Sequence, residues 1–132
     1  MDRTWNILLV DDDPDFLHAA KRVLGHSHRL RAHVETALAA EEALRIVDER
    51  LFDVVVADYR MHPDDGAELL RKVREAKPEL KRVLLTGFDR DALKSQGVGH
   101  SEVDLVLNKN DLLADLDRKL TEFLEMSARA DG

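Results

Sequence analysis

Charged and hydroxyl side chains stand at the ends of several short apolar runs in this sequence. They are Asp11, Asp12 and Asp13 after the first run, Asp58 after the third, Thr86 at the end of the fourth and Lys109 after the fifth. Carboxylates that lie close together raise one another's pKa unless a cation lies between them. Oxygen ligands without histidine or cysteine favour a hard ion, and Mg²⁺ prefers a few carboxylates together with water and a phosphate oxygen. This set of residues therefore predicts a magnesium site.

The same residues could also transfer a phosphoryl group. A carboxylate can act as the nucleophile and take the group as an acyl phosphate. The hydroxyl of Thr86 and the ammonium of Lys109 could then neutralise the charge on its oxygens. Each residue alone fits a structural role, since a single aspartate can cap a turn and a single lysine is usually a surface charge. Only the combination favours phosphoryl transfer, and it requires a fold that brings the residues together.

Strand and helix patterns alternate five times along the chain, which implies a parallel sheet with helices on both faces. Strands are predicted at residues 7–10, 30–35, 54–58, 83–86 and 103–107, and helices at 14–24, 39–49, 66–77, 89–96 and 112–124. Residues 128–132 are expected to fray. Right-handed crossovers place the carboxyl ends of all strands along one edge, where ligands bind in open α/β sheets.

Local signals add detail to two of these elements. Asp13 followed by Pro14 is typical of a helix start, with the aspartate as N-cap and proline at the first helical position. In residues 30–35, apolar Leu30, Ala32 and Val34 alternate with polar residues. This period of two indicates a half-exposed strand at the edge of the sheet.

Length and composition indicate one globular domain, residues 1–132 with a core of about 6–124. Hydrophobic residues make up 44% of the chain and charged residues 36%, which excludes a disordered chain. No run of 18 apolar residues predicts a membrane span, and the net charge of −7 argues against direct nucleic-acid binding. The chain has no cysteine, and its first residues lack the pattern of a secretory signal, so we expect a cytoplasmic location.

The motifs VDDD, VVVADYRM followed by Gly66, LLTG and LNK, in this order, resemble the receiver domain of two-component response regulators. The resemblance covers residues from 6 to about 124 and implies a doubly wound α/β fold. Its five-stranded parallel sheet has the flavodoxin/CheY-like order 2-1-3-4-5. By resemblance, Asp58 is the phosphoacceptor, Asp11 and Asp12 hold Mg²⁺ with Asp58 and the Arg60 backbone carbonyl, and Thr86 and Lys109 contact the phosphoryl group.

The resemblance also implies partners. A histidine kinase or a histidine phosphotransfer protein would donate the phosphoryl group, and phosphorylation would change contacts with a downstream target or an effector domain outside this chain. The protein would be a monomer or weak dimer, and a catalyst only of its own phosphorylation and dephosphorylation. A stand-alone receiver and part of a longer regulator both remain open.

Several positions depart from the pattern of that family. Asn110 replaces the proline that usually follows the site lysine, and Val106 replaces the Tyr or Phe that acts as a rotamer switch. In Met61-His62-Pro63 the proline comes one place late. The acidic site is thus complete, whereas the usual readout of its phosphorylation is altered.

The residues two places beyond the phosphoacceptor and the threonine border the path of the attacking water in this family. Here they are Arg60 and Phe88. Arg60 can hold phosphoryl oxygens by charge-assisted bonds, and Phe88 cannot orient a water molecule. This pair predicts slow loss of the phosphoryl group.

Two other interpretations each fit part of the sequence. The run Asp11-Asp12-Asp13 also fits the opening motif of haloacid-dehalogenase-like phosphatases, with Asp11 as nucleophile and Asp13 as general acid. That interpretation leaves Asp58 without a role and lacks a late acidic pair. A degenerate receiver that docks without being phosphorylated is supported only by Val106 and Asn110.

Overall fold

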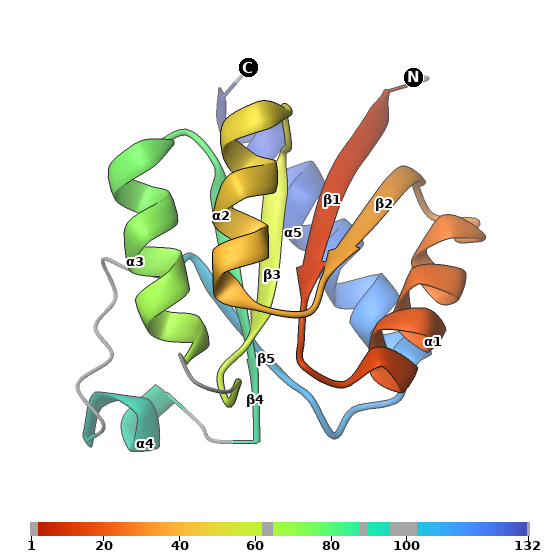
Figure 1. The fold of residues 1–132 in the computed structure, drawn as a ribbon. Helices are drawn as coiled ribbons and strands as arrows, with labels where there is room; N and C mark the ends of the chain where they lie inside the picture. The colour runs from red at the N-terminus through yellow and green to blue at the C-terminus, as the bar shows by residue number, and fades with distance from the viewer. Residues whose placement is uncertain (1–2, 62–64, 88–89, 96–102, 132) are drawn as a thin grey trace.

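A five-stranded parallel sheet in the order β2-β1-β3-β4-β5 forms the centre of the molecule. The computed structural model describes residues 3–61, 65–87, 90–95 and 103–131. The strands are β1 Thr4–Val10, β2 Arg31–Ala37, β3 Val54–Asp58, β4 Lys81–Thr86 and β5 Leu105–Asn108, and the helices are α1 Pro14–Gly25, α2 Ala40–Glu49, α3 Gly66–Ala76, α4 Arg90–Ser95 and α5 Leu113–Asp131. Helices α2 and α3 cover one face of the sheet, and α1 and α5 cover the other (Figure 1). The predicted strand order and the two-sided helical cover are confirmed.

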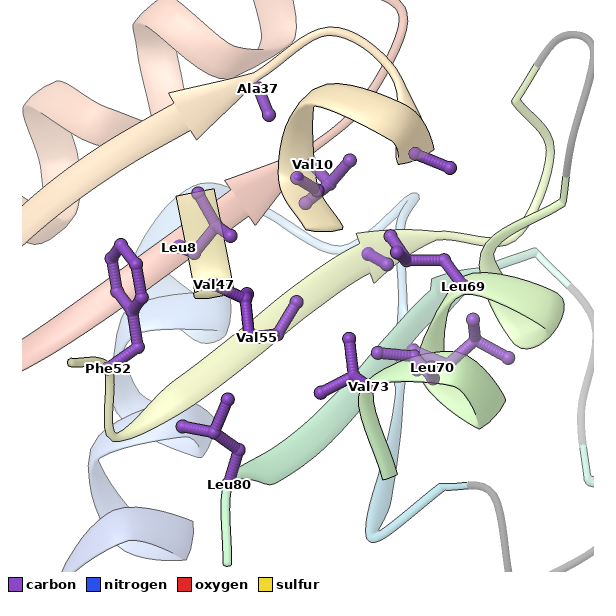
Figure 2. Packing of buried hydrophobic residues seen from close by; sticks show 14 of the residues in the cluster. Leu8, Val10, Ala37, Val47, Phe52, Val55, Leu69, Leu70, Val73 and Leu80 are labelled. Atoms are coloured by element: carbon purple, nitrogen blue, oxygen red, sulfur yellow. The ribbon is translucent and has the colours of Figure 1, made fainter. Parts of the chain in front are cut away.

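The alternation of side chains along the strands builds two apolar cores. In β3, Val55 points to the core under α2 and α3, and Val54 points to the core under α1 and α5. Figure 2 shows Leu8 and Val55 of the sheet meeting Val47 of α2 and Val73 of α3. All five residues of β3 are buried, as expected for a central strand of a parallel sheet. This burial fixes the position of the strand that ends in Asp58.

Aspartate caps set where two helices begin. The side chain of Asp13 accepts a hydrogen bond from the backbone N–H of Asp15, and Pro14 follows at the first helical position, as predicted. Asp65 caps α3 in the same way by accepting from the N–H of Glu68 at 2.7 Å. Both helices therefore start close to the carboxyl ends of the strands that precede them.

The fifth strand begins later than the alternation of residues 103–107 predicted. Val103 is buried on the α2–α3 side, whereas Leu105 and Leu107 pack on the α1–α5 side, so the alternation breaks at Asp104. The Asp104 carboxylate accepts the N–H of Arg82 at 2.8 Å, and the N–H of Asp104 donates to the Arg82 carbonyl at 2.8 Å. These two bonds hold Asp104 beside the start of β4, and regular strand geometry resumes only at Leu105.

Arg82 itself is a buried cation on β4. Its guanidinium Nη2 lies 3.5 Å from Oδ1 of Asp104, while Nε and Nη1 are buried without a hydrogen-bond partner among the described residues. Unpaired buried donors are costly, so this ion pair is a weak source of stability.

The end of the chain does not fray where fraying was predicted. Helix α5 continues to Asp131, and Ala128 is half-buried against the α1–α5 core. The packing of Ala128 buries apolar surface in the last turns of α5 and so stabilises them. The small and polar residues at the chain end gave no sign of this contact. In the parts of the chain that the structure describes, helices with the length and apolar character of a membrane span are absent.

Candidate functional site

Three carboxylates meet at the carboxyl ends of β1 and β3. One oxygen from each of Asp11, Asp12 and Asp58 lies within 4.8 Å of the others. The sheet register places Val10 of β1 beside Ala57 of β3. The residues that follow them, Asp11 and Asp58, therefore come to the same edge of the sheet. Asp11 is 0% exposed and Asp58 is buried, whereas Asp12 is exposed. The acidic cluster predicted from the sequence is therefore present and opens to solvent through Asp12.

Lys109 reaches this cluster from the end of β5. Its ammonium Nζ lies 2.6 Å from Oδ2 of Asp11 and 3.1 Å from Oδ2 of Asp58. The N–H of Lys109 donates to the Thr86 carbonyl at 3.1 Å, which ties the lysine backbone to the end of β4. Nζ of Lys109 also lies over the ring of Phe16 in α1, 4.8 Å from the ring centroid.

Burial and charge act against each other in this cluster. Burial raises the pKa of Asp11, and the neighbouring charge of Asp58 raises it too, although Lys109 and the Asp13 N–H oppose the shift. Burial alone lowers the pKa of Lys109, but its bonds to Asp11 and Asp58 outweigh burial and raise this pKa above its ordinary value. The lysine therefore stays charged, and the buried Asp11 carboxylate is only partly compensated.

The donor set fits a hard divalent cation such as Mg²⁺. All three ligating groups are carboxylates, which suit this class of ion. Oδ2 of Asp11 is buried, and its described partner is the Lys109 ammonium at 2.6 Å, which leaves the oxygen able to accept a second partner. Oδ1 of the same carboxylate accepts the N–H of Asp13 at 3.0 Å and is thereby held in place. A buried acceptor with spare capacity beside two further carboxylates is what a cation ligand requires.

Gly66 is required by the backbone of Asp58. A Cβ added at Gly66 would lie 2.8 Å from the carbonyl carbon of Asp58 and closer still to its oxygen. The N–H of Gly66 donates to the Tyr59 carbonyl at 2.8 Å, and Arg60 forms an isolated bridge with Asp65. Helix α3 thus begins in direct contact with the strand end that carries Asp58.

The other predicted site residues have different outcomes. Thr86 is buried as the last residue of β4, at the same edge of the sheet as the carboxylates. The Asp13 side chain caps α1, which gives it a structural role. The predicted role of the Arg60 carbonyl as a metal ligand stays a prediction. His62, Pro63 and Phe88 lie outside the described residues.

Two contributors to the site were not recognised from the sequence. Phe16 was assigned to the apolar stripe of the first helix, yet its ring also contacts Lys109. The side chain of Asn108 accepts the N–H of Asn110 at 2.8 Å and shapes the turn after β5. One signal in the sequence could have identified Phe16. It lies three residues after the predicted N-cap Asp13, and the first turn of that helix faces the edge of the sheet that carries Lys109.

Residues 7–120 match the family described as response regulator receiver domain, and the chain belongs to this family. The Brucella abortus response regulator receiver protein CpdR is 30% identical over 118 residues, which cover 89% of this chain and 95% of CpdR. The Escherichia coli K12 transcriptional regulatory protein GlrR is 33% identical over 98 residues, 70% of this chain and 21% of GlrR. This chain therefore corresponds to about a fifth of that relative.

A solved structure shows the same fold. The Thermotoga maritima response regulator protein TrrA, in complex with Mg²⁺-BeF, superposes with a TM-score of 0.74 at 28% identity and covers 89% of this chain and 97% of TrrA. The protein is thus a receiver domain of two-component response regulators, a signalling class. The phosphatase interpretation finds no support in these relatives.

Proposed function

We propose that Asp58 accepts a phosphoryl group from a phosphohistidine of a histidine kinase or phosphotransfer protein. The observation that carries this proposal is the cluster of three carboxylate oxygens within 4.8 Å, with the Lys109 ammonium 3.1 Å from Asp58. Asp11 and Asp58 are both buried and both paired with Lys109, and Asp58 is the one that stands at the family's phosphoacceptor position. The complex of TrrA with Mg²⁺-BeF supports the same chemistry in a relative.

The transfer forms one bond and breaks another. An oxygen of the Asp58 carboxylate attacks phosphorus, the P–N bond to the donor imidazole breaks, and the imidazole leaves with the electron pair. In the later hydrolysis, water attacks phosphorus, the bond from phosphorus to the carboxylate oxygen breaks, and free phosphate leaves. Lys109 offsets charge on the phosphoryl oxygens, and the Thr86 hydroxyl at the same edge donates to one of them.

Asp11, Asp12 and Asp58, with the Arg60 carbonyl, would hold Mg²⁺. The ion, when bound, supplies positive charge that lets an anionic phosphoryl group approach the carboxylates. Without such a cation, the buried Asp11 and its neighbours repel the incoming group.

The output we propose is a change in protein contacts, with a separate target or with an effector domain outside this chain. The match covers 95% of CpdR, which fits a stand-alone receiver. The match covers 21% of GlrR, which fits a receiver within a longer regulator. We propose that residues of about 6–124 form one domain core, that the protein is a monomer or weak dimer, and that it works in the cytoplasm as a phosphoacceptor rather than as an enzyme acting on other substrates.

Incubation with acetyl phosphate and Mg²⁺, followed by mass mapping, tests the assignment. We expect one added phosphoryl group on the peptide with Asp58, absent in Asp58→Asn and absent when EDTA replaces Mg²⁺. Asp13→Asn is the matched control: asparagine caps a helix as well as aspartate does, so labelling should persist. Label that survives in Asp58→Asn and disappears in Asp11→Asn would overturn the assignment. A folded protein without any label would favour an unphosphorylated docking module.

A further inference from the structure

The ammonium of Lys109 has one uncharged neighbour among its described contacts. Besides Asp11 at 2.6 Å and Asp58 at 3.1 Å, it lies 4.8 Å from the centroid of the Phe16 ring. Phe16 is half-buried in the first turn of α1 and packs against the core between the sheet, α1 and α5. It is not part of the carboxylate cluster, so its contact with the lysine is independent of the charges there.

The two ion pairs alone leave the lysine head free to move. A lysine side chain is a flexible four-carbon stem with three rotatable donors, and a carboxylate accepts them over a broad range of directions. The Lys109 side chain is also 26% exposed, so water competes for its donors. The face of an aromatic ring attracts an ammonium and excludes water from that side. Phe16 therefore restricts the positions that the Lys109 ammonium can take while it is bound to the two carboxylates.

We propose that Phe16 is a positioning residue that holds the Lys109 ammonium where phosphoryl oxygens arrive. This inference rests on the proposed phosphorylation of Asp58. When Asp58 becomes an acyl phosphate, its 3.1 Å ion pair with Lys109 is rebuilt around phosphoryl oxygens. Phe16 takes no part in that exchange, so the ring contact persists before and after transfer and keeps the lysine preorganised.

The placement of the ring follows from the start of the helix. Asp13 caps α1 and Pro14 occupies its first position, which fixes Phe16 as the third helical residue. The next residue, Leu17, is buried in the core and anchors this turn against the sheet. The contact with Lys109 therefore joins the start of the first helix to the end of the last strand.

A fluorinated series at Phe16 tests the role of the ring face. Mono-, di- and trifluorophenylalanine weaken the negative ring face with little change in shape. We expect the maximal rate of labelling by acetyl phosphate to fall stepwise, to about fivefold below wild type for trifluorophenylalanine and for Phe16→Leu. The Mg²⁺ concentration for half-maximal rate should stay unchanged. Phe16→Tyr keeps an aromatic face and should label at the wild-type rate. The same series at Phe123, half-buried in the same core, is the control and should have no effect.

A second readout needs neither Mg²⁺ nor activity. In the metal-free wild type, the ε-methylene protons of Lys109 should show an upfield ring-current shift that Phe16→Leu removes. Equal rates across the fluorinated series, or no ring-current shift in the folded wild type, would overturn the proposal and leave Phe16 as a packing residue. Failure to label Asp58 in wild type would instead overturn the proposed function, and the ring-current shift would still test the contact.

Discussion

Replacing Asp11 by asparagine should stabilise the metal-free protein and abolish its response to Mg²⁺. At an effective dielectric constant of about 20, charges 4.8 Å apart repel by about 3.5 kcal/mol. The two repulsions of Asp11, with Asp12 and Asp58, therefore amount to about 7 kcal/mol. The attraction to Lys109 at 2.6 Å is about 6 kcal/mol on the same scale.

Because these charge terms nearly cancel, burial decides the sign. Asp11 is fully buried, and burial is the main cause of its raised pKa. Asparagine keeps an oxygen that can accept the Asp13 N–H without the cost of a buried charge. We expect a gain of about 1 kcal/mol or more, equivalent to about 3–5 °C in Tm for a domain of this size.

Thermal unfolding in EDTA and in Mg²⁺ measures this effect. Wild type should gain about 2.7 kcal/mol at a hundred times the Kd of Mg²⁺, and the variant should gain almost nothing, so an advantage of about 1 kcal/mol for the variant in EDTA is reversed in Mg²⁺. In EDTA, the folded wild type has a raised pKa at Asp11, so it binds more protons than the unfolded chain between that pKa and 3.8. The advantage of the variant should therefore be full at neutral pH and shrink as pH falls through this window.

Asp13→Asn is the control, with unchanged behaviour in both buffers. A lower Tm for Asp11→Asn in EDTA at neutral pH would show that the Lys109 ion pair outweighs burial and repulsion, and would refute the reasoning. An equal Mg²⁺ response in wild type and variant would remove Asp11 from the cation site.

Three further predictions concern other parts of the molecule. Gly66→Ala forces its Cβ against the carbonyl of Asp58, so it should abolish labelling by acetyl phosphate and cost about 2 kcal/mol or more in urea unfolding; normal labelling would contradict the close approach. Asp104→Ala leaves Arg82 buried and unpaired, so it should destabilise the protein by about 2–4 kcal/mol, whereas Arg82→Leu should cost less than about 1 kcal/mol; the reverse order would show that the pair itself stabilises. The double variant Arg60→Asn, Phe88→Glu should lose its phosphoryl group at least about tenfold faster than wild type at saturating Mg²⁺, and equal decay rates would contradict the predicted shielding.

The fold was predictable because its signals are local and repeated. Short β-branched runs alternate with amphipathic helices, and the handedness of crossovers then determines which edge of the sheet carries the strand ends. Asp13-Pro14 gave the start of α1 to the residue. The limits of β5 were not predictable, because Asp104 bonds to Arg82, a residue distant in sequence, and this contact breaks the alternation.

The site was predictable in composition and less so in contacts. Three carboxylates and a lysine follow predicted strands, and a parallel sheet brings the carboxyl ends of its strands to one edge. The sequence therefore predicts that these side chains lie together. The ring of Phe16 was not identified, since an apolar residue in an amphipathic helix reads as core and only the three-dimensional structure shows the cation beside it. The persistence of α5 to Asp131 was missed for a similar reason, because it depends on packing of Ala128.

The separation of the site residues along the chain has a consequence for how the domain forms. Asp11 and Asp12 follow β1 and Asp58 ends β3, which is the neighbour of β1 in the sheet, while Lys109 follows β5 at the far edge. During synthesis from the N-terminus, the three carboxylates emerge and can be brought together before their lysine exists. A nascent half-sheet thus carries an uncompensated cluster of like charge, and cellular Mg²⁺ would favour pairing of β1 with β3 most strongly at this stage. A divalent cation that offsets these charges would in this way also favour folding of the domain on the ribosome.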